Sequence, residues 1–209
     1  DVQPHPDFAS NGLIYITYSK PYTDLEGART VLIRGTFQND ALTNVEELFS
    51  AQAVGGGHYG SRIAFDGNGY VFITAGDRQV PSRGDLYAHP AQDLSNHHGV
   101  VVRLHDDGRI PADNPFVGTE GALGEIWSYG HRNPQGLAFH PMTGELWARW
   151  GRTQRRPPWT QLWLACNRVW RQLWKWLNDP RRDAQGRDGI PKAFLGSVDR
   201  NLGTDDLHR

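Results

Sequence analysis

The sequence predicts an all-β fold for residues 1–148, on three observations. Short runs rich in β-branched and aromatic residues recur along this part of the chain. Turn-forming dipeptides with Gly, Asn, Asp or Pro separate these runs. A helical period of apolar residues does not persist over about a dozen residues anywhere in this part. Short strands joined by turns therefore account for most of it.

The first predicted strand runs from Leu13 to Tyr18, where side chains alternate in polarity ahead of a loop that contains Pro and Gly. The next two, Arg62 to Asp66 and Tyr70 to Ala75, flank Gly67-Asn68-Gly69. Asn-Gly between two apolar runs is a strong signal for a hairpin. We therefore expect these two strands to pair.

The later strands follow the same pattern. Val100 to Leu104 leads into the turn Asp106-Asp107-Gly108, and Glu125 to Tyr129 forms the next strand. Gly136 to His140 and Glu145 to Trp147 are joined by a turn that contains Pro and Gly. This last pair predicts a second hairpin.

Weak internal repetition indicates how these strands are arranged. Ile63 to Phe72 and Leu137 to Trp147 share a pattern of strand, Gly-containing turn and strand ending in an aromatic residue, and His5 to Tyr15 matches it loosely. Each blade of a β-propeller supplies such a unit twice. We therefore predict a partial β-propeller. The irregular spacing of the units leaves a β-sandwich as the alternative.

The chain changes character near Ala148. Residues 1–148 carry 9 basic and 17 acidic side chains, whereas residues 149–209 carry 13 basic and 6 acidic ones. Six of the eight Trp residues lie between Trp150 and Trp176, as does Cys166, the one cysteine. We therefore divide the chain into a partial β-propeller, 1–148, and a tail, 149–209, that is not a domain. A single Cys excludes an internal disulfide.

Composition excludes several functional classes. An apolar run of about 18 residues is missing, so a membrane span is not expected. A basic and then apolar leader is also missing, so a signal peptide is not recognisable in this chain. Nucleic acid is not an expected partner.

The segment Gly55-Gly56-Gly57-His58-Tyr59-Gly60 matches the G-x-G-x-x-G pattern of dinucleotide sites. We reject that interpretation because a strand, not a helix, follows the segment. The glycines either form a flexible approach to the strand or let His58 project into a cavity next to a flat ligand. In the second case His58 is a candidate general base.

A second loop, Gly130 to Gly136, contains Arg132 and Asn133 between glycines and a proline. Arg offers a planar fork suited to carboxylates, and Asn both donates and accepts hydrogen bonds. This pair favours an anionic ligand, and the alternative is a structural turn with an exposed Arg.

Other polar clusters are weaker candidates. His97 and His98 resemble a metal pair, but we expect them in a loop without a ligand role. Asp106-Asp107 and Asp113-Asn114 have side chains that suit Ca²⁺, yet such residues more often form turns. We assign no metal ligand.

Together these stretches resemble the soluble PQQ-dependent sugar dehydrogenases, the glucose/sorbosone and aldose sugar dehydrogenase family. The matching stretches are His5 to Phe8, His58 to Arg62, Gly99 to Leu104, Asp107 to Phe116 and, most specifically, Glu125 to Phe139. They cover nearly all of residues 1–148.

The resemblance implies a six-bladed propeller, of which this chain holds about three blades, and the cofactors PQQ and calcium. It implies oxidation of an aldose sugar at C1, an electron acceptor as second partner, and a periplasmic or secreted location. By position, His58 resembles the catalytic base of the family, and Arg132 and Asn133 resemble its PQQ-contacting pair. Asp77 and Gln79 lie in a loop that lines the cofactor pocket of the family, and Gln79 is a further candidate contact. Some members carry Asp before the base, where this chain has Gly57, so the sequence does not identify a carboxylate that orients His58.

The tail departs from the family after Trp147. Codons allowed for Gln161 to Ala165, read one base later, spell the family's Asn-Tyr-Gly-Trp-Pro run, and other segments behave similarly. We infer a frameshift at Ala148–Arg149, and we expect a truncated chain that is inactive as written. One alternative is an irregular or helical tail, with an amphipathic helix over residues 159–178 that binds a membrane surface or nucleic acid. Another is a fragment that binds sugar or calcium without redox chemistry.

Overall fold

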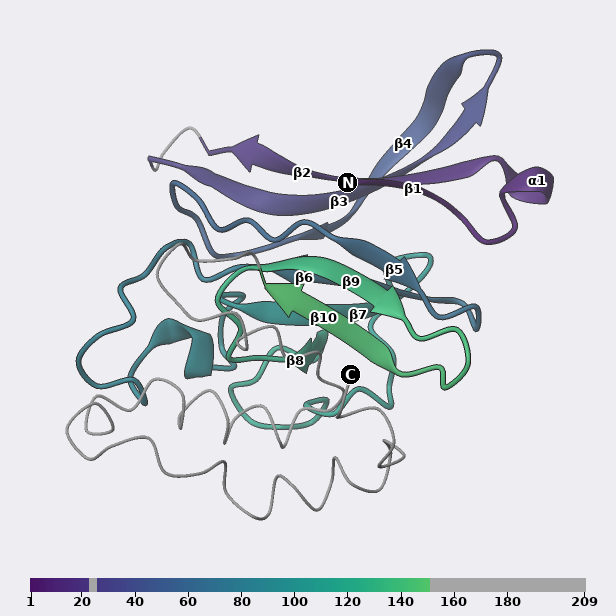
Figure 1. The fold of residues 1–209 in the computed structure, drawn as a ribbon. Helices are drawn as coiled ribbons and strands as arrows, with labels where there is room; N and C mark the ends of the chain where they lie inside the picture. Colours follow the sequence, from purple (N-terminus) through teal and green to yellow (C-terminus); the bar gives the residue numbers. More distant parts are fainter. Residues whose placement is uncertain (23–25, 151–209) are drawn as a thin grey trace, which may run out of the picture.

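The computed structural model describes residues 1–22 and 26–150, and the strands of this part form three antiparallel sheets (Figure 1). The first sheet has the order β1-β2-β3-β4. A short helix, α1 (Phe8–Asn11), connects its first two strands and ends at Gly12, whose positive φ of 64° terminates the helical turn. The strands are β1 (Val2–Pro4), β2 (Leu13–Pro21), β3 (Ala28–Gln38) and β4 (Ala41–Ser50).

The second sheet has the order β5-β6-β7-β8, and the third consists of β9 and β10. A 3₁₀ helix, η1 (Pro90–Gln92), lies in the long loop between β6 and β7. The strands of the second sheet are β5 (Ile63–Phe65), β6 (Tyr70–Ala75), β7 (Val100–His105) and β8 (Ile126–Ser128). Those of the third are β9 (Pro134–Phe139) and β10 (Leu146–Trp150).

The first strands of the three sheets lie next to one another. β1 contacts β5, and both β5 and β6 contact β9. The later strands of each sheet lie farther from this junction of β1, β5 and β9, as in the blades of a propeller (Figure 1). The predicted all-β class and partial β-propeller are confirmed, with two four-stranded sheets and a third sheet of two described strands.

The predicted strands occur close to their predicted bounds, but the hairpin of β3 and β4 was not predicted. Its turn consists of Asn39 and Asp40, both with positive φ (53° and 59°), and Gln38 pairs with Ala41. A two-residue turn with positive φ at both positions matches the twist of the flanking strands. Asn-Asp is a weaker signal for this turn than Asn-Gly, so the sequence does not reveal it.

The core lies between the first two sheets. Tyr15 and Leu32 from the first sheet and Ile73, Val102 and Ile126 from the second are almost completely buried in one cluster. Alternate residues on β6 and β7 face this cluster, as the two-residue period of a strand requires. The core therefore fixes both sheets relative to each other.

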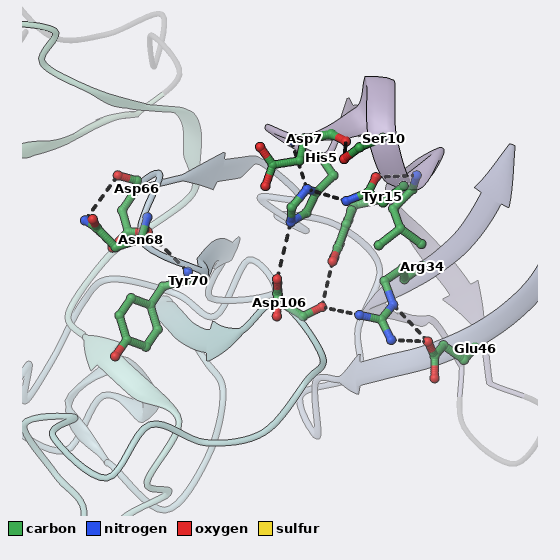
Figure 2. A network of polar contacts seen from close by, with 12 residues as sticks. His5, Asp7, Ser10, Tyr15, Arg34, Glu46, Asp66, Asn68, Tyr70 and Asp106 are labelled. Atoms are coloured by element: carbon green, nitrogen blue, oxygen red, sulfur yellow. Dashed lines mark hydrogen bonds and ion pairs between the residues drawn. The ribbon is translucent and has the colours of Figure 1, made fainter.

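Polar contacts strengthen the same junction at the rim that carries the β7–β8 loop (Figure 2). The carbonyl oxygen of Asp106 accepts hydrogen bonds from the Tyr15 hydroxyl at 2.7 Å and from Nη1 of Arg34 at 2.9 Å. The Asp106 carboxylate lies 3.3 Å from Nε2 of His5. Three side chains of the first sheet region thus hold one turn of the second.

The predicted boundary at residue 148 falls inside β10, which continues to Trp150. The remainder of the predicted tail, 151–209, lies outside the described residues. The inferred frameshift and the alternative helix therefore stay predictions. Within the described part of the chain, the helices lack the length and apolar character that crossing a membrane requires.

Candidate functional site

Three loops reach the same rim of the molecule, opposite the β5–β6 and β9–β10 turns. They are residues 51–62 between β4 and β5, residues 76–99 between β6 and β7, and residues 129–133 between β8 and β9. Antiparallel strands alternate in direction, so every second connection falls on one rim. Binding and catalytic residues commonly occupy such loops on a rigid scaffold.

His58 lies in the first of these loops with one ring nitrogen engaged. Its Nδ1 lies 2.6 Å from Oδ1 of Asp77, whose side chain is buried. A carboxylate accepts hydrogen bonds, so the proton resides on Nδ1. Nε2 has no hydrogen-bond partner among residues 1–22 and 26–150, and the side chain is 21% exposed. The hydrogen bond to Asp77 therefore fixes the orientation of the ring, and in this tautomer Nε2 is the unprotonated nitrogen.

Among the described residues, the Asp77 carboxylate accepts three hydrogen bonds, one from each of the three rim loops. Besides Nδ1 of His58, it accepts from Nη1 of Arg132 at 2.6 Å and from the backbone N–H of Gln79 at 3.0 Å. Its own backbone N–H donates to the carbonyl oxygen of Arg132 at 2.8 Å. Asp77 thus links the second and third loops through both its side chain and its backbone.

Arg132 retains unused donors. Its Nη1 also donates to the carbonyl oxygen of Val80 at 3.0 Å and to Oγ of Ser82 at 2.7 Å. Nε and Nη2 donate to no residue in the described part of the chain, and the side chain is 34% exposed. A guanidinium held at one nitrogen and open at the others can pair with an anionic ligand.

Asn133 and Gln79 lie beside these groups. Oδ1 of Asn133 accepts a hydrogen bond from the backbone N–H of Gly60 at 3.1 Å, which leaves its amide NH₂ available. The Gln79 side chain packs against Gly57, where an added Cβ would lie 2.7 Å from Cδ of Gln79. Gly57 therefore gives Gln79 its space, and a larger residue before His58 would require the end of the Gln79 side chain to move.

Gly76 permits the close approach of the first two loops. An added Cβ at this position would lie 2.0 Å from the carbonyl oxygen of His58. The backbone of His58 itself has a φ of +52°, and Arg78 and Gln79 have φ values of +57° and +65°. Non-glycine residues in this conformation are uncommon, and they concentrate at functional sites.

The structure brings the four predicted site residues together. His58, Gln79, Arg132 and Asn133 surround Asp77 or lie directly beside its partners. Asp77 supplies the orienting carboxylate that the sequence did not identify. The available signal was an acidic residue directly after the buried strand β6 and Gly76, on the rim where the candidate loops meet.

The other polar clusters are structural. His97 is buried, its Nε2 lies 3.0 Å from Oε1 of Glu125, and its Nδ1 accepts from the backbone N–H of Gln52. Asp113 and Asn114 accept hydrogen bonds from Nη1 of Arg103. Among the residues that the structure describes, no three His, Cys, Asp or Glu side chains converge as metal ligands. The described side chains therefore do not fit a calcium ion.

Comparisons with known proteins identify the family of this chain. A family model described as Glucose / Sorbosone dehydrogenase matches residues 1–151. The chain is 41% identical over 152 residues to Aldose sugar dehydrogenase YliI of Escherichia coli (strain K12), covering 70% of this chain and 38% of the relative. It is 32% identical over 158 residues to Quinoprotein glucose dehydrogenase B of Acinetobacter calcoaceticus, covering 66% and 32%.

Solved structures give the same result. The apo form of the soluble aldose sugar dehydrogenase from Escherichia coli matches with a TM-score of 0.66 and 38% identity, covering 74% of this chain and 43% of that structure. The PQQ-bound form of aldose sugar dehydrogenase from Streptomyces coelicolor matches with a TM-score of 0.57 and 25% identity, covering 71% and 40%. The chain thus spans well under half the length of the proteins it resembles.

Proposed function

Because the chain belongs to the glucose/sorbosone dehydrogenase family, we propose that its rim loops form part of a site for PQQ-dependent oxidation of an aldose sugar at C1. The observation that carries this proposal is His58, whose Nδ1 is fixed by buried Asp77 while Nε2 has no partner among the described residues. A base oriented in this way by a carboxylate is suited to removing a proton from a hydroxyl group.

His58 has the role of catalytic base in this proposal. Its Nε2 accepts the proton of the C1 hydroxyl, and Asp77 stabilises the imidazolium that forms. When bound, PQQ supplies the quinone that accepts hydride from C1, so the sugar loses two electrons and two hydrogens. The protein provides orientation and charge, and the cofactor provides the redox chemistry.

Arg132, Asn133 and Gln79 are the proposed cofactor contacts. PQQ is flat and carries three carboxylates, which suit the Nε and Nη2 donors that Arg132 leaves unused. The side-chain amides of Asn133 and Gln79 offer further hydrogen bonds on the same rim. The residues present therefore fit an anionic, planar cofactor, whereas a calcium ion would need ligands beyond the described side chains.

The remaining parts of the proposal rest on the family. An electron acceptor reoxidises the cofactor, and the location is periplasmic or secreted. The 209-residue chain alone is inactive as a dehydrogenase, because it matches only 38% of the length of Aldose sugar dehydrogenase YliI. The rest of that relative has no matched counterpart here.

Binding of PQQ to the purified chain tests the proposal. We expect titration with PQQ, followed by fluorescence quenching, to show binding that Arg132→Gln weakens about tenfold to a hundredfold. This range corresponds to losing a charged hydrogen-bonding group worth about 1.5–3 kcal/mol. Arg109→Gln is the matched control, since its side chain is 74% exposed and pairs with Asp107 in the β7–β8 loop, outside the three rim loops.

Two outcomes would contradict parts of this proposal. Equal PQQ affinity for wild type and Arg132→Gln, or no affinity in either, would overturn the cofactor site. Binding of an aldose without any PQQ binding would favour a sugar-binding protein without redox chemistry. Sugar-dependent dye reduction in the presence of PQQ and Ca²⁺ would overturn the inactivity of this chain while supporting the activity itself.

A further inference from the structure

A buried arginine lies beneath the proposed base. The Arg78 side chain is 6% exposed, and its guanidinium donates four hydrogen bonds. The acceptors are the carbonyl oxygens of Ala53 at 3.1 Å, His58 at 2.8 Å and Gly76 at 3.1 Å, and Oγ1 of Thr30 at 2.9 Å. One side chain therefore connects β3 of the first sheet with both loops that carry the base and its carboxylate.

Burying the charged Arg78 side chain costs desolvation free energy, so its position needs an explanation. Desolvation lowers the pKa of Arg78 to about 10, with the nearby Asp77 charge acting in the opposite direction. The guanidinium remains charged at neutral pH, and four of its five N–H donors have an acceptor. A buried charge with this many hydrogen bonds fixes the geometry of the groups around it.

The group most in need of fixing is the His58 backbone. Its φ of +52° lies in the left-handed region, and its carbonyl oxygen points at Gly76, where there is no room for a Cβ. Arg78 donates a hydrogen bond to that carbonyl oxygen, while Asp77 accepts a hydrogen bond from the ring of the same residue. Backbone and ring of His58 are thus fixed by two consecutive residues, Asp77 and Arg78, from one loop.

We propose that Arg78 is a positioning residue for His58, which holds the base in its left-handed backbone conformation so that its ring meets Asp77. This inference rests on the proposed function, because that function gives His58 its role as the base. The alternative is a brace that joins the first and second sheets without any effect on His58. Stability alone does not distinguish the two, because both lose hydrogen bonds when Arg78 is replaced.

Arg103 provides a matched control. It is also a buried arginine, 7% exposed, with Nη1 bonded to Asp113 and Asn114 and its guanidinium stacked 3.8 Å from the centre of the Tyr70 ring. None of these contacts belongs to the rim loops that hold His58. Replacing Arg103 by Lys therefore disturbs a guanidinium of similar burial that contacts other residues.

The experiment compares Arg78→Lys with Arg103→Lys in the full chain by ¹⁵N NMR of the His58 ring at about pH 8, where free histidine is neutral. Wild type is expected to show one tautomer, with the proton on Nδ1. Arg78→Lys keeps the charge but cannot reach four acceptors, so we expect the single tautomer to be lost. Arg103→Lys should keep the wild-type spectrum although it also lowers the unfolding midpoint.

A milder pair keeps the test decisive if Arg78→Lys does not fold. Thr30→Val removes one acceptor of Arg78 and, with it, the hydrogen bond from the same hydroxyl to the carbonyl oxygen of Tyr59 at 2.6 Å. Thr17→Val on β2 is the control, because its buried hydroxyl also donates to the loop of residues 51–62, at the carbonyl oxygen of Ser61, but is not among the acceptors of Arg78. We expect a smaller change of the His58 spectrum in Thr30→Val alone. A wild-type His58 spectrum in every folded variant would overturn the inference. The readout needs no cofactor, so failure to bind PQQ contradicts the proposed function and leaves this result standing.

Discussion

Gly76 is a residue at which the site has almost no room. An added Cβ would lie 2.0 Å from the carbonyl oxygen of His58 and 3.0 Å from Oδ1 of Asn133. A methyl group at this point would therefore push apart two loops that the Asp77 contacts hold together. The requirement for glycine here is one of space.

Gly76→Ala is expected to lower the free energy of unfolding by about 1–3 kcal/mol, the usual cost of inserting an atom into a packed site. Urea denaturation measures this change. Gly56→Ala is the matched control, because an added Cβ there would meet nothing within 4 Å. Equal stability of the two variants would show that the loops are not in contact at Gly76.

His131 is a second residue whose environment has a measurable consequence. It is 2% exposed, and desolvation lowers its pKa to about 4. Its Nε2 lies at hydrogen-bonding distance from Oγ of Ser128. Because an exposed histidine titrates near 6.5, the unfolded chain binds a proton in the range between these values and the folded chain does not.

The stability that neutral His131 contributes is complete above about pH 6.5 and is lost as the pH falls toward 4. The loss amounts to about 3 kcal/mol at most, on the scale of about 1.4 kcal/mol per unit of pKa. Unfolding free energies measured from pH 7 to 4 should show a steeper decline for wild type than for His131→Gln. Parallel slopes for the two proteins would contradict the assignment.

At the scale of elements, the β7–β8 turn is held by the first sheet through Tyr15. This side chain is completely buried, its ring packs edge-on against Phe65, and its hydroxyl donates to the Asp106 carbonyl oxygen (Figure 2). Arg34 shares the same acceptor. The junction between the two complete sheets therefore depends on both apolar packing and a buried hydrogen bond.

Tyr15→Phe keeps the packing and removes the hydrogen bond. We expect it to lower the free energy of unfolding by about 1 kcal/mol, the net value typical of such a bond. Thermal unfolding followed by circular dichroism provides the measurement, with exposed Tyr18→Phe as control. A change no larger than that of the control would show that the Tyr15 hydroxyl does not help to hold the turn.

The sequence predicts those elements whose signals are local. β5, β6, β9 and β10 follow from alternating residues around turns with Gly, and His58, Arg132 and Asn133 follow from loops rich in Gly and Pro. The hairpin of β3 and β4 was missed because its Asn39-Asp40 turn lacks glycine. The pairing of Asp77 with His58 and Arg132 depends on loops 19 and 55 residues apart, which local patterns do not join.

At the scale of the whole molecule, the two rims differ in the loops and residues that they carry. One rim carries the loops with His58, Asp77 and Arg132, which come from connections before, within and after the second sheet. The other carries short turns and the Asp106 junction. No single sheet supplies all three residues. The site therefore depends on the connection from the first sheet to the second and on the connection from the second sheet to the third.

The β9–β10 turn belongs to the second of these rims, and it contains Met142, which is 90% exposed and is the one methionine of the chain. Exposed loop tips tolerate modification well. A thioether that is unique and accessible is a chemical handle, so a fluorophore or an affinity matrix can be attached there selectively. Immobilised through Met142, the protein would present His58 and Arg132 to the solution rather than to the support.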